Sequence, residues 1–356
     1  MSTPAINTLE VSLFDRHTHT RNLPFSEHVI PFVTKHSWGS LAMPNTAPKL
    51  KTWQEAAEYK KMLQRFSPPG YVWIVTCYLT DITDPSNLEE GFANGTWQAA
   101  KLYPAGMTTN SDEGVTNVRK LQKVLERMAK INMPLLVHGE KACAECHPDH
   151  AEDRFMTDEL PHLVQAGGPI ILEHVSAGAT ANMVATEQYP NIVGATLTPQ
   201  HLLFDSGALT QTTRFHPKFE RGGMTHMVCM PTLKMPSHRN QILDAVRKNP
   251  KKFGAGSDIA FHQQAAKHRR VAACGCATPR RVELWATAFD GAGILPLLPD
   301  FLGKNLLEYY GLAQVPNHLI LTREDCDREE AIGIDEFTVD SMSAGMKLPW
   351  TCRPLW

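Results

Sequence analysis

Two histidines one residue apart are the first residues along the chain whose types and spacing could do chemistry. His17 and His19 lie in "DRHTHT", directly after the apolar run "VSLF". On an extended strand, residues i and i+2 point to the same side, so both imidazoles would aim at one point in space. Such a pair is either half of a metal site or two histidines whose ring nitrogens are hydrogen-bonded within the fold. The metal interpretation requires further ligands elsewhere in the chain.

Four further residues with ligand or nucleophile side chains follow other apolar runs. They are Lys101 in "QAAKLYP", His138 in "PLLVHGE", His174 in "PIILEHV" and Asp258 in "FGAGSDIA". Each has an ordinary explanation by itself, because a lysine can extend to solvent along its stem and a core histidine can bond a carbonyl. Their recurrence at the ends of apolar runs favours one shared site. Imidazoles with a carboxylate favour a transition metal over a metal that prefers only oxygen ligands.

Elements that would position these residues alternate along the chain. Short apolar runs bounded by turn residues predict strands at 12–18, 39–44, 72–79, 98–104, 134–140, 169–175, 192–199 and 253–260. Amphipathic patterns predict helices at 52–66, where Thr52 and Glu55 have the spacing of a capping box, and at 114–132. Alternation of this kind predicts a parallel sheet covered by helices, and eight such units predict a closed (β/α)8 barrel with its chemistry at the C-terminal ends of the strands.

Composition places this barrel among ordinary globular proteins. The chain has 356 residues, 42% of them hydrophobic and 20% charged, with a formal net charge of -2. We expect one domain over residues 1–356, with an excursion over the barrel mouth in about 199–250. The charge gives no reason to expect a nucleic acid or an anionic membrane as partner. No apolar run approaches the roughly 20 residues of a membrane span, and the first residues lack a signal-peptide pattern, so we expect a cytoplasmic protein.

Cysteines suggest a second place where a metal could bind. In a cytoplasmic chain of this size, the eight cysteines are expected to be reduced thiols. "CAECH", which runs from Cys143 to His147, matches the haem-attachment string, and Cys143 with Cys146 could form half of a zinc site. No second C-x-x-C completes a four-cysteine site, and no export signal accompanies the haem string. We therefore interpret this spacing as a coincidence in a polar loop.

Lys101 is the unusual member of the predicted site, because an ammonium cannot bind a metal. Burial and nearby cations lower the pKa of a lysine and leave a nucleophilic amine. Such an amine can add carbon dioxide to form a carbamate, which is an anionic ligand that can bridge. Lys101 could then hold two metals about 3.5–4 Å apart, as in other two-metal sites.

The order of these residues resembles the amidohydrolase superfamily: H-x-H on the first strand, lysine on the fourth, histidines on the fifth and sixth, and aspartate on the eighth. Further strings, among them "MPNTAP", "KLYPAGMTTNS", "LLVHGE", "CMPTLK" and "ACGCA", are similar to the stand-alone, homodimeric class of dihydroorotases. The resemblance runs from about residue 9 to the end. It implies a zinc-dependent cyclic amide hydrolase that interconverts L-dihydroorotate and N-carbamoyl-L-aspartate in de novo pyrimidine (UMP) biosynthesis.

The resemblance also implies the metal ligands and the proton carrier. One zinc would bind His17, His19 and Asp258. The other would bind His138 and His174, and carboxylated Lys101 (N6-carboxylysine) would bridge the two ions together with a hydroxide. Asp258 would be the catalytic residue, which accepts the proton of the hydroxide and passes it to the leaving ring nitrogen.

Substrate contacts are implied in the same way. Arg21 and Asn45 would bind the remote carboxylate of the substrate, joined by His262. Main-chain groups of Met230 and Ala277 would hold the ring amide. Thr108 and Thr109 would belong to a mobile loop that closes over the substrate and excludes water.

Some positions depart from the pattern of the family. Arg16, Thr18 and Thr20 replace apolar residues around the first two histidines, and "IAF" at 259–261 replaces serine-alanine-proline. Two alternatives to a dihydroorotase therefore stay open. One is another cyclic-amide hydrolase of the superfamily, similar to a hydantoinase or allantoinase, and the other is a catalytically silent homologue that acts as a scaffold.

Overall fold

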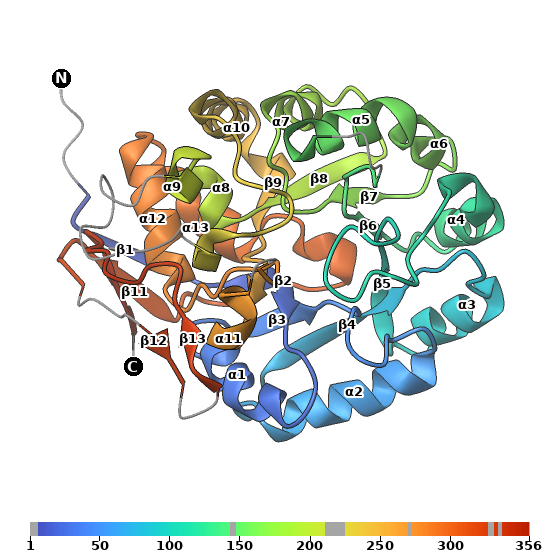
Figure 1. The fold of residues 1–356 in the computed structure, drawn as a ribbon, viewed down its shortest axis with the longest axis horizontal. Coiled ribbons are helices and arrows are strands. Elements are labelled where there is room, and N and C mark those ends of the chain that lie inside the picture. Colours follow the sequence, from blue (N-terminus) through green and yellow to red (C-terminus); the bar gives the residue numbers. More distant parts are fainter. Residues whose placement is uncertain are drawn as a thin grey trace.

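The eight strands predicted from the sequence form one parallel sheet that curls into a barrel (Figure 1). The computed structural model of the chain describes residues 6–142, 147–210, 225–269, 272–326, 331–333 and 337–355. In order around the barrel the strands are β2 (Phe14–His19), β3 (Gly39–Ala42), β4 (Val72–Tyr78), β5 (Trp97–Leu102), β6 (Leu135–Val137), β7 (Ile170–Leu172), β8 (Ile192–Leu197) and β9 (Phe253–Ala255). The predicted (β/α)8 architecture is confirmed.

The eighth strand closes the barrel in two pieces. β9 pairs with β8 through Phe253 and Ala195, whereas β10 (Ile259–Ala260) pairs with β2 through Ile259 and Thr18. Between the pieces, a Cβ on Gly256 would lie 2.8 Å from Cβ of Thr196, so only glycine fits there without displacing a neighbour. The break leaves Asp258 beside the C-terminal end of β2.

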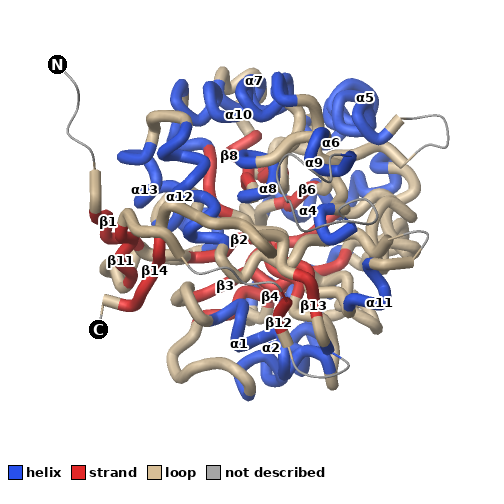
Figure 2. The backbone as a smooth tube through the Cα atoms, turned by 60° about the vertical axis from the view of Figure 1, so that its left-hand side comes forward, coloured by secondary structure: helices blue, strands red, loops and turns tan. Residues whose placement is uncertain are grey.

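Helices lie outside the barrel strands, as Figures 1 and 2 show. Going round from β2, they include α1 (Phe25–Thr34), α2 (Trp53–Arg65), α3 (Pro85–Ala93), α4 (Gln122–Lys130), α5 (Ala151–Asp158), α6 (Leu160–Val164), α7 (Gly178–Ala185), α10 (Pro236–Lys248), α12 (Arg281–Gly291) and α13 (Leu298–Gly303). The predicted helix at 52–66 is confirmed with its capping box: the Thr52 hydroxyl accepts from the Glu55 amide, and the Glu55 carboxylate accepts from the Thr52 amide.

The helix predicted at 114–132 begins later than the sequence indicated. Val115 donates its N–H to the carbonyl of Tyr103 at 2.8 Å, so its backbone is tied to the loop after β5 and cannot enter a helix. Asn117 then caps a single 3-10 turn, η1 (Val118–Leu121), by accepting from the Arg119 amide. The apolar spacing predicted helical structure correctly from residue 118 onward. Before residue 118 the hydrogen bond of Val115 to Tyr103 prevents a helix.

The segment predicted as an excursion contains several short elements. The described part holds α8 (Pro199–Leu203), α9 (Gly207–Thr210), η3 (Thr225–Met227) and α10, while residues 211–224 lie outside the described residues. That the segment crosses the barrel mouth, and that the chain is a single domain, both stay predictions. Within the part of the chain that the structure describes, no helix is long and apolar enough to cross a membrane.

A small antiparallel sheet that the sequence did not predict lies beside the barrel, at the left of Figure 2. Its strand order is β1 (Thr8–Val11), β11 (Leu319–Thr322) and β14 (Thr351–Pro354). β1, near the start of the chain, pairs with β11, with Val11 opposite Leu319. β11 in turn pairs with β14, with Leu321 opposite Cys352. Pairing across so long a separation leaves no local pattern in the sequence.

Core packing follows the two faces of the barrel sheet. The inward-facing cluster takes Phe14, Leu41, Ile74, Ala99, Leu136 and Ile171 from six successive strands, and Leu306, Leu307 and Tyr310 pack against them. The larger cluster lies between the outward faces of the strands and the helices. This filling makes the barrel interior a packed core, so an open site is possible only at an end.

A buried ion pair ties the broken eighth strand to β2 and α12. Oδ2 of Asp15 lies 2.8 Å from Nε of Arg281, and both side chains are fully buried. The same carboxylate accepts hydrogen bonds from the amide (2.9 Å) and the hydroxyl (2.6 Å) of Ser257, directly before Asp258. Burial raises the pKa of Asp15, and the Arg281 guanidinium opposes that rise. This network therefore adjoins the predicted ligands along the chain: Asp15 lies two residues before His17, and Ser257 lies directly before Asp258.

Removing the cation of this pair should destabilise the fold strongly. Arg281→Met leaves a buried carboxylate without a counter-charge, which should lower the free energy of unfolding by about 3–5 kcal/mol. Urea unfolding followed by circular dichroism measures the effect. Combining it with Asp15→Asn should cost less than the sum of the two single changes, because the double variant buries no unpaired charge. Strictly additive losses would mean that the two side chains do not act as a pair.

Candidate active site

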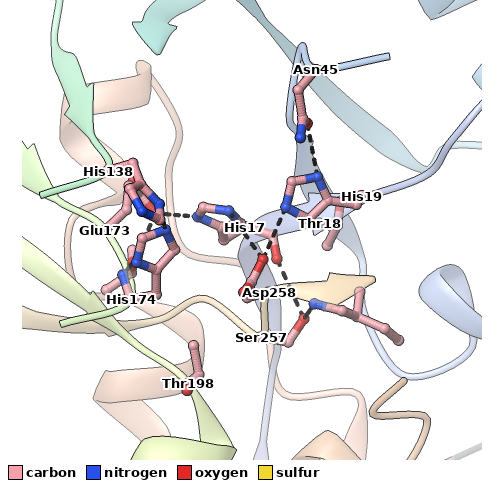
Figure 3. A network of polar contacts seen from close by, with 12 residues as sticks. His17, Thr18, His19, Asn45, His138, Glu173, His174, Thr198, Ser257 and Asp258 are labelled. Carbon is pink, nitrogen blue, oxygen red and sulfur yellow. Dashed lines mark hydrogen bonds and ion pairs between the residues drawn. The ribbon is translucent and has the colours of Figure 1, made fainter. Parts of the chain in front are cut away.

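The six residues predicted as metal ligands lie at the C-terminal ends of the barrel strands. Figure 3 shows five of them, His17, His19, His138, His174 and Asp258. His17 and His19 end β2, Lys101 lies in β5, His138 directly follows β6, His174 lies two residues beyond β7, and Asp258 occupies the break between β9 and β10. All six are buried, with at most 9% of any of them exposed. The common location predicted from the sequence is therefore what the structure shows.

One half of the cluster consists of His17, His19 and Asp258. Oδ1 of Asp258 lies 2.9 Å from Nε2 of His19 and 3.4 Å from Nε2 of His17. The three ligand atoms fall within 4.8 Å of one another, which suits a shared cation.

The other half consists of His138 and His174. Nδ1 of His138 and Nε2 of His174 face each other at 3.0 Å. The rings of His17 and His174 have their centroids 5.0 Å apart, which joins the two halves. Lys101 reaches the same region: its Nζ lies 5.0 Å from the centroid of the Tyr103 ring and has no hydrogen-bond partner among the described residues.

In three of the imidazoles, the ring nitrogen that faces away from the cluster forms a hydrogen bond to a side-chain oxygen. Nδ1 of His17 contacts Oε2 of Glu173 at 2.5 Å, and Nδ1 of His19 contacts Oδ1 of Asn45 at 2.9 Å. In the same way, Nε2 of His138 contacts Oε2 of Glu140 at 2.8 Å. Donation to these oxygens fixes the ring orientation and leaves a lone pair on the inward nitrogen, as in metal-binding histidines generally.

The inward atoms of the cluster are therefore acceptors that face each other. Because His19 donates through Nδ1, its Nε2 lone pair points at the carboxylate of Asp258, and the two repel unless a cation lies between them. His138 likewise turns a lone pair toward His174. Nε2 of His17 is buried and makes no hydrogen bond among the described residues. A donor set of this kind fits a divalent metal such as Zn²⁺.

Electrostatics keep these groups in their metal-binding protonation states. Burial, with the nearby Lys101 as a smaller cause, lowers the pKa of His17 well below its ordinary value, and burial lowers the pKa of His19 and His174 as well. Burial acts to raise the pKa of Asp258, but contact with His19, followed by the charges that His17, His19 and Lys101 carry when protonated, outweighs it and lowers that pKa to about 2. Neutral imidazoles and an ionised carboxylate are the forms that bind metals.

Burial also shifts Lys101 and Glu173 toward their neutral forms. Burial lowers the pKa of Lys101 to about 8, although Glu173 and Asp258 oppose it. Burial raises the pKa of Glu173 to about 7, against the effect of Lys101. An unpartnered lysine amine near neutrality is a nucleophile that can react with carbon dioxide.

Backbone strain gathers at the site. Arg21, His174 and Asp258 have positive φ values of 62°, 40° and 51°, in the region that L residues rarely adopt. The amide of His174 is held by Oγ1 of Thr196 at 2.8 Å, which fixes that backbone conformation. Such strain persists only where the surrounding contacts determine the conformation, and it is typical of functional sites.

The pocket above the cluster contains most of the residues predicted to bind substrate. Arg21, Asn45, Thr108, Thr109 and Met230 line it together with the histidines and Asp258. Sequence reasoning did not single out four other lining residues, Tyr103, Ala260, Cys274 and Gly275.

Two of the predicted contacts stand outside the pocket wall. His262 lies behind Arg21, with its Nε2 2.7 Å from Nη2 of Arg21 and 2.8 Å from the carbonyl of Cys274. Burial, followed by the charge of Arg21, lowers the pKa of His262 to about 2. The carbonyl of Ala277 accepts from the amide of Met342 at 2.8 Å, so this carbonyl is already engaged. Substrate binding by these two residues stays a prediction.

The loop that carries Thr108 and Thr109 lies across the pocket. Nδ2 of Asn45 donates to the carbonyl of Thr109 at 3.0 Å, and the hydroxyl of Thr109 lies 3.5 Å from the carbonyl of Cys274. Asn45 thus connects His19 to this loop, a role that the sequence did not indicate. Whether the loop moves stays a prediction.

Three of the residues that depart from the family pattern point away from the pocket. Nη1 of Arg16 donates to the carbonyls of Phe14 (2.9 Å) and Leu302 (3.0 Å). The hydroxyl of Thr18 donates to the carbonyl of Leu41, and that of Thr20 contacts the hydroxyl of Tyr59. None of these three residues lines the pocket, whereas Ala260 of the 259–261 segment does.

Glu140 and Glu173, which contact the histidines, are two further site residues that sequence reasoning missed. A signal was present, because each glutamate lies within two residues of a predicted ligand histidine: "HGE" at 138–140 and "EH" at 173–174. The alternative metal string could not be tested, because Cys143 and Cys146 lie outside the described residues.

Comparison with known proteins gives relatives that span the whole chain. No protein-family model matches the chain. A dihydroorotase from Enterobacter sp. (strain 638) is 34% identical over 347 residues, covering 95% of this chain and 96% of that protein. A dihydroorotase from Saccharomyces cerevisiae, solved in complex with 5-fluoroorotic acid, is 23% identical with a TM-score of 0.87, covering 98% and 99% of the two chains. An L-hydantoinase from Arthrobacter aurescens is 14% identical with a TM-score of 0.77, covering 98% and 83%. At these identities, the two structures show a shared fold.

The carboxylate behind His17 should control metal affinity. Glu173→Gln keeps the size of the side chain but weakens the acceptor for Nδ1 of His17, so Zn²⁺ affinity should fall roughly 10–100-fold. Competition with a fluorescent chelator measures this directly. Glu283→Gln is the matched control, because burial also raises the pKa of Glu283 to about 7, but the groups that act on it are main-chain amides and the charges of Arg280 and Arg281, with no histidine among them. Equal affinities in the Glu173 variant and the wild type would contradict the orienting role.

Proposed function

The chain belongs to the dihydroorotase family, and on this premise we propose that it interconverts L-dihydroorotate and N-carbamoyl-L-aspartate at the pocket above its histidine cluster. The resemblance found in the sequence is confirmed at the level of the family. The observation that carries the proposal is the joint placement of five of the six predicted metal ligands and Arg21 in the lining of one pocket. The ligand residues could hold the metal ions that activate water for hydrolysis. The guanidinium of Arg21 could bind a carboxylate of the substrate.

We propose two Zn²⁺ ions per subunit as the cofactor. His17, His19 and Asp258 would hold one, His138 and His174 the other, and carboxylated Lys101 would bridge them. When bound, such metals lower the pKa of water and polarise a carbonyl. Support for the carbamate comes from Lys101 itself, whose buried Nζ lacks a hydrogen-bond partner among the described residues and whose pKa burial lowers to about 8.

Asp258 is the proposed proton carrier. Its carboxylate accepts the proton of the attacking water as the new C–O bond forms, and donates it to the ring nitrogen as the C–N bond breaks. The low pKa of Asp258, about 2, means that it holds this proton only transiently. Its Oδ1 lies 2.9 Å from Nε2 of His19, the ligand with which it would share a metal.

Arg21 and Asn45 are the proposed partners of the substrate's remote carboxylate. Nε of Arg21 donates to the carbonyl of Phe261 at 3.0 Å, which fixes the plane of the guanidinium at the pocket wall. A guanidinium fixed in this way can bind a carboxylate with two parallel hydrogen bonds. Asn45 lies on the opposite side of His19 and lines the same pocket.

The alternatives remain distinguishable from this proposal. A hydantoinase-like enzyme would act on rings without a remote carboxylate, for which Arg21 has no use. A silent scaffold would not need a complete ligand set. Family membership also supports the proposals of a homodimer and a cytoplasmic location.

The substrate assignment sets how the reaction equilibrium depends on pH. Ring opening of dihydroorotate creates a second carboxylate and releases one proton near neutrality, so the equilibrium ratio of open to closed forms should rise roughly tenfold per pH unit between about pH 6 and 8. The absorbance of dihydroorotate, followed with purified, zinc-loaded protein in reactions that start from either compound, measures this equilibrium ratio. Hydantoin and dihydrouracil, which lack the remote carboxylate, are the control substrates. Faster turnover of either control would overturn the assignment.

The lysine bridge predicts a specific chemical rescue. Lys101→Ala removes the bridging anion, so Coulomb repulsion between the two cations should expel at least one zinc and abolish most activity. Acetate or propionate at millimolar concentration should enter the cavity left by the side chain and restore part of the zinc content and part of the activity. Elemental analysis and turnover, measured side by side, test this, with the exposed Lys304→Ala as control. An active, fully metallated Lys101→Ala protein would exclude the binuclear arrangement.

A further inference from the structure

Two main-chain segments that are far apart in the sequence meet at one wall of the pocket. Met230 lines the pocket from the segment after η3, and Cys274 and Gly275 line it from the segment before α12. The amide of Gly275 donates to the carbonyl of Val228 at 3.0 Å, and a thiol–thiol contact between Cys229 and Cys276 also joins the two segments. A wall made of loops needs more than one such hydrogen bond to keep a fixed shape.

A buried lysine supplies the missing links. Lys267 ends the short helix α11 (Gln264–Lys267) and is 3% exposed. Its Nζ lies 2.9 Å from the carbonyl of Val228 and 2.8 Å from the carbonyls of Ala273 and Gly275. An ammonium has three N–H donors, so all three are used on main-chain oxygens of the two wall segments.

The surroundings make this placement costly for a residue with no specific role. Burial lowers the pKa of Lys267, and the charged or polarisable groups that act on it are the thiols of Cys229, Cys274 and Cys276 together with Arg21. No carboxylate of the described residues is among them. A buried cation without a carboxylate partner is destabilising unless hydrogen bonds compensate fully.

We propose that Lys267 is a positioning residue that fixes the main chain at 228–230 and 273–275 in the arrangement that binds the ring amide of the substrate. This inference rests on the proposed function, because it assigns the wall a ligand. Three carbonyl dipoles directed at one point repel each other unless a cation occupies that point. Without the ammonium, the two segments would separate.

Peptide geometry explains how a cation behind the wall affects the pocket in front of it. In a trans peptide the N–H points opposite to the C=O. The three carbonyls that face Lys267 belong to the peptides of Cys229, Cys274 and Cys276, so those N–H groups point away from the ammonium. The cation also polarises these peptides, which strengthens the N–H groups as donors.

The wall has little freedom to adjust if this link is lost. Gly275 has a φ of +133°, and a Cβ there would lie 2.5 Å from Cβ of Ala260, so the segment packs directly against β10. The amide of Ala260 donates to the carbonyl of Cys276 at 2.9 Å. A shift of the segment would therefore displace a residue that also lines the pocket.

Substitution of Lys267 should raise KM far more than it lowers kcat. Lys267→Met keeps the length of the stem but removes the charge and the three donors, so KM for dihydroorotate should rise roughly tenfold or more with kcat within about threefold of wild type. Zinc content should not change, because Lys267 touches none of the metal-binding residues. Lys234→Met is the matched control. Lys234 is also buried, but among the described residues its Nζ makes one long hydrogen bond, 3.4 Å to the carbonyl of Pro148.

Hydrogen exchange separates this proposal from the proposed function. In Lys267→Met, amides in 225–231 and 272–277 should exchange faster than in the wild type, whether or not dihydroorotate is the substrate. An unreactive wild-type protein would reject the function and leave the exchange result as the test of the link. Unchanged KM in a reactive variant, even with lower thermal stability, would overturn the positioning role.

Should Lys267→Met fail to fold, Lys267→Ala refolded with propylammonium replaces it. Propylammonium carries the same three donors into the cavity and should lower KM toward the wild-type value, whereas propanol, which is similar in size but neutral, should not. Equal effects of the two compounds would overturn the proposal.

Discussion

The barrel closes through a strand that is broken at its functional end, and the site depends on that break. β9 pairs with β8 and β10 pairs with β2, so the three residues between them belong to neither ladder. Gly256 permits the close approach to β8, and Asp258 takes a left-handed conformation that turns its carboxylate toward His19. The buried pair of Asp15 and Arg281 holds the break from below through Ser257. A continuous eighth strand would point this carboxylate elsewhere.

Burial and hydrogen bonding together determine what the cluster can bind. Desolvation favours neutral imidazoles and a neutral lysine, and the outward hydrogen bonds of His17, His19 and His138 decide which nitrogen keeps its lone pair. The inward surface is consequently rich in acceptors and poor in donors. Such a surface is unfavourable by itself and favourable around cations, which is why the arrangement fits a metal centre better than a proton-transfer pair.

Substrate selection must come from the loops above the barrel. A hydantoinase that shares 14% identity has the same fold, so the barrel framework does not set the ring that is accepted. The groups that could do so lie on separate connections: Arg21 after β2, Asn45 after β3, Thr109 after β5, and Met230 with Cys274 and Gly275 near the eighth strand. Asn45 and Lys267 each join two of these connections by hydrogen bonds. The pocket is thus held as one unit although it is built from distant segments.

The sequence by itself determined the barrel and the common location of the residues predicted as ligands, because both follow from local patterns. Each strand is a short apolar run, and the residues predicted as ligands lie at or just after the end of a run. Because the C-terminal ends of parallel barrel strands meet at one end of the barrel, these residues come together there. The same logic found Thr52 as a helix cap. It failed at Val115, where pairing with the loop after β5 overrides an apolar helical period.

Only the tertiary structure decided the partners of these residues. Whether Asn45 bonds His19, whether Glu173 orients His17 and whether Lys267 joins 228 to 273–275 depend on contacts between segments that are far apart in the chain. A side chain's type states what it can bond, but the identity of its neighbour follows from the path of the backbone. For the same reason, the sheet of β1, β11 and β14 left no trace in the sequence: pairing across more than 300 residues is fixed by the closed barrel, which brings both ends of the chain together.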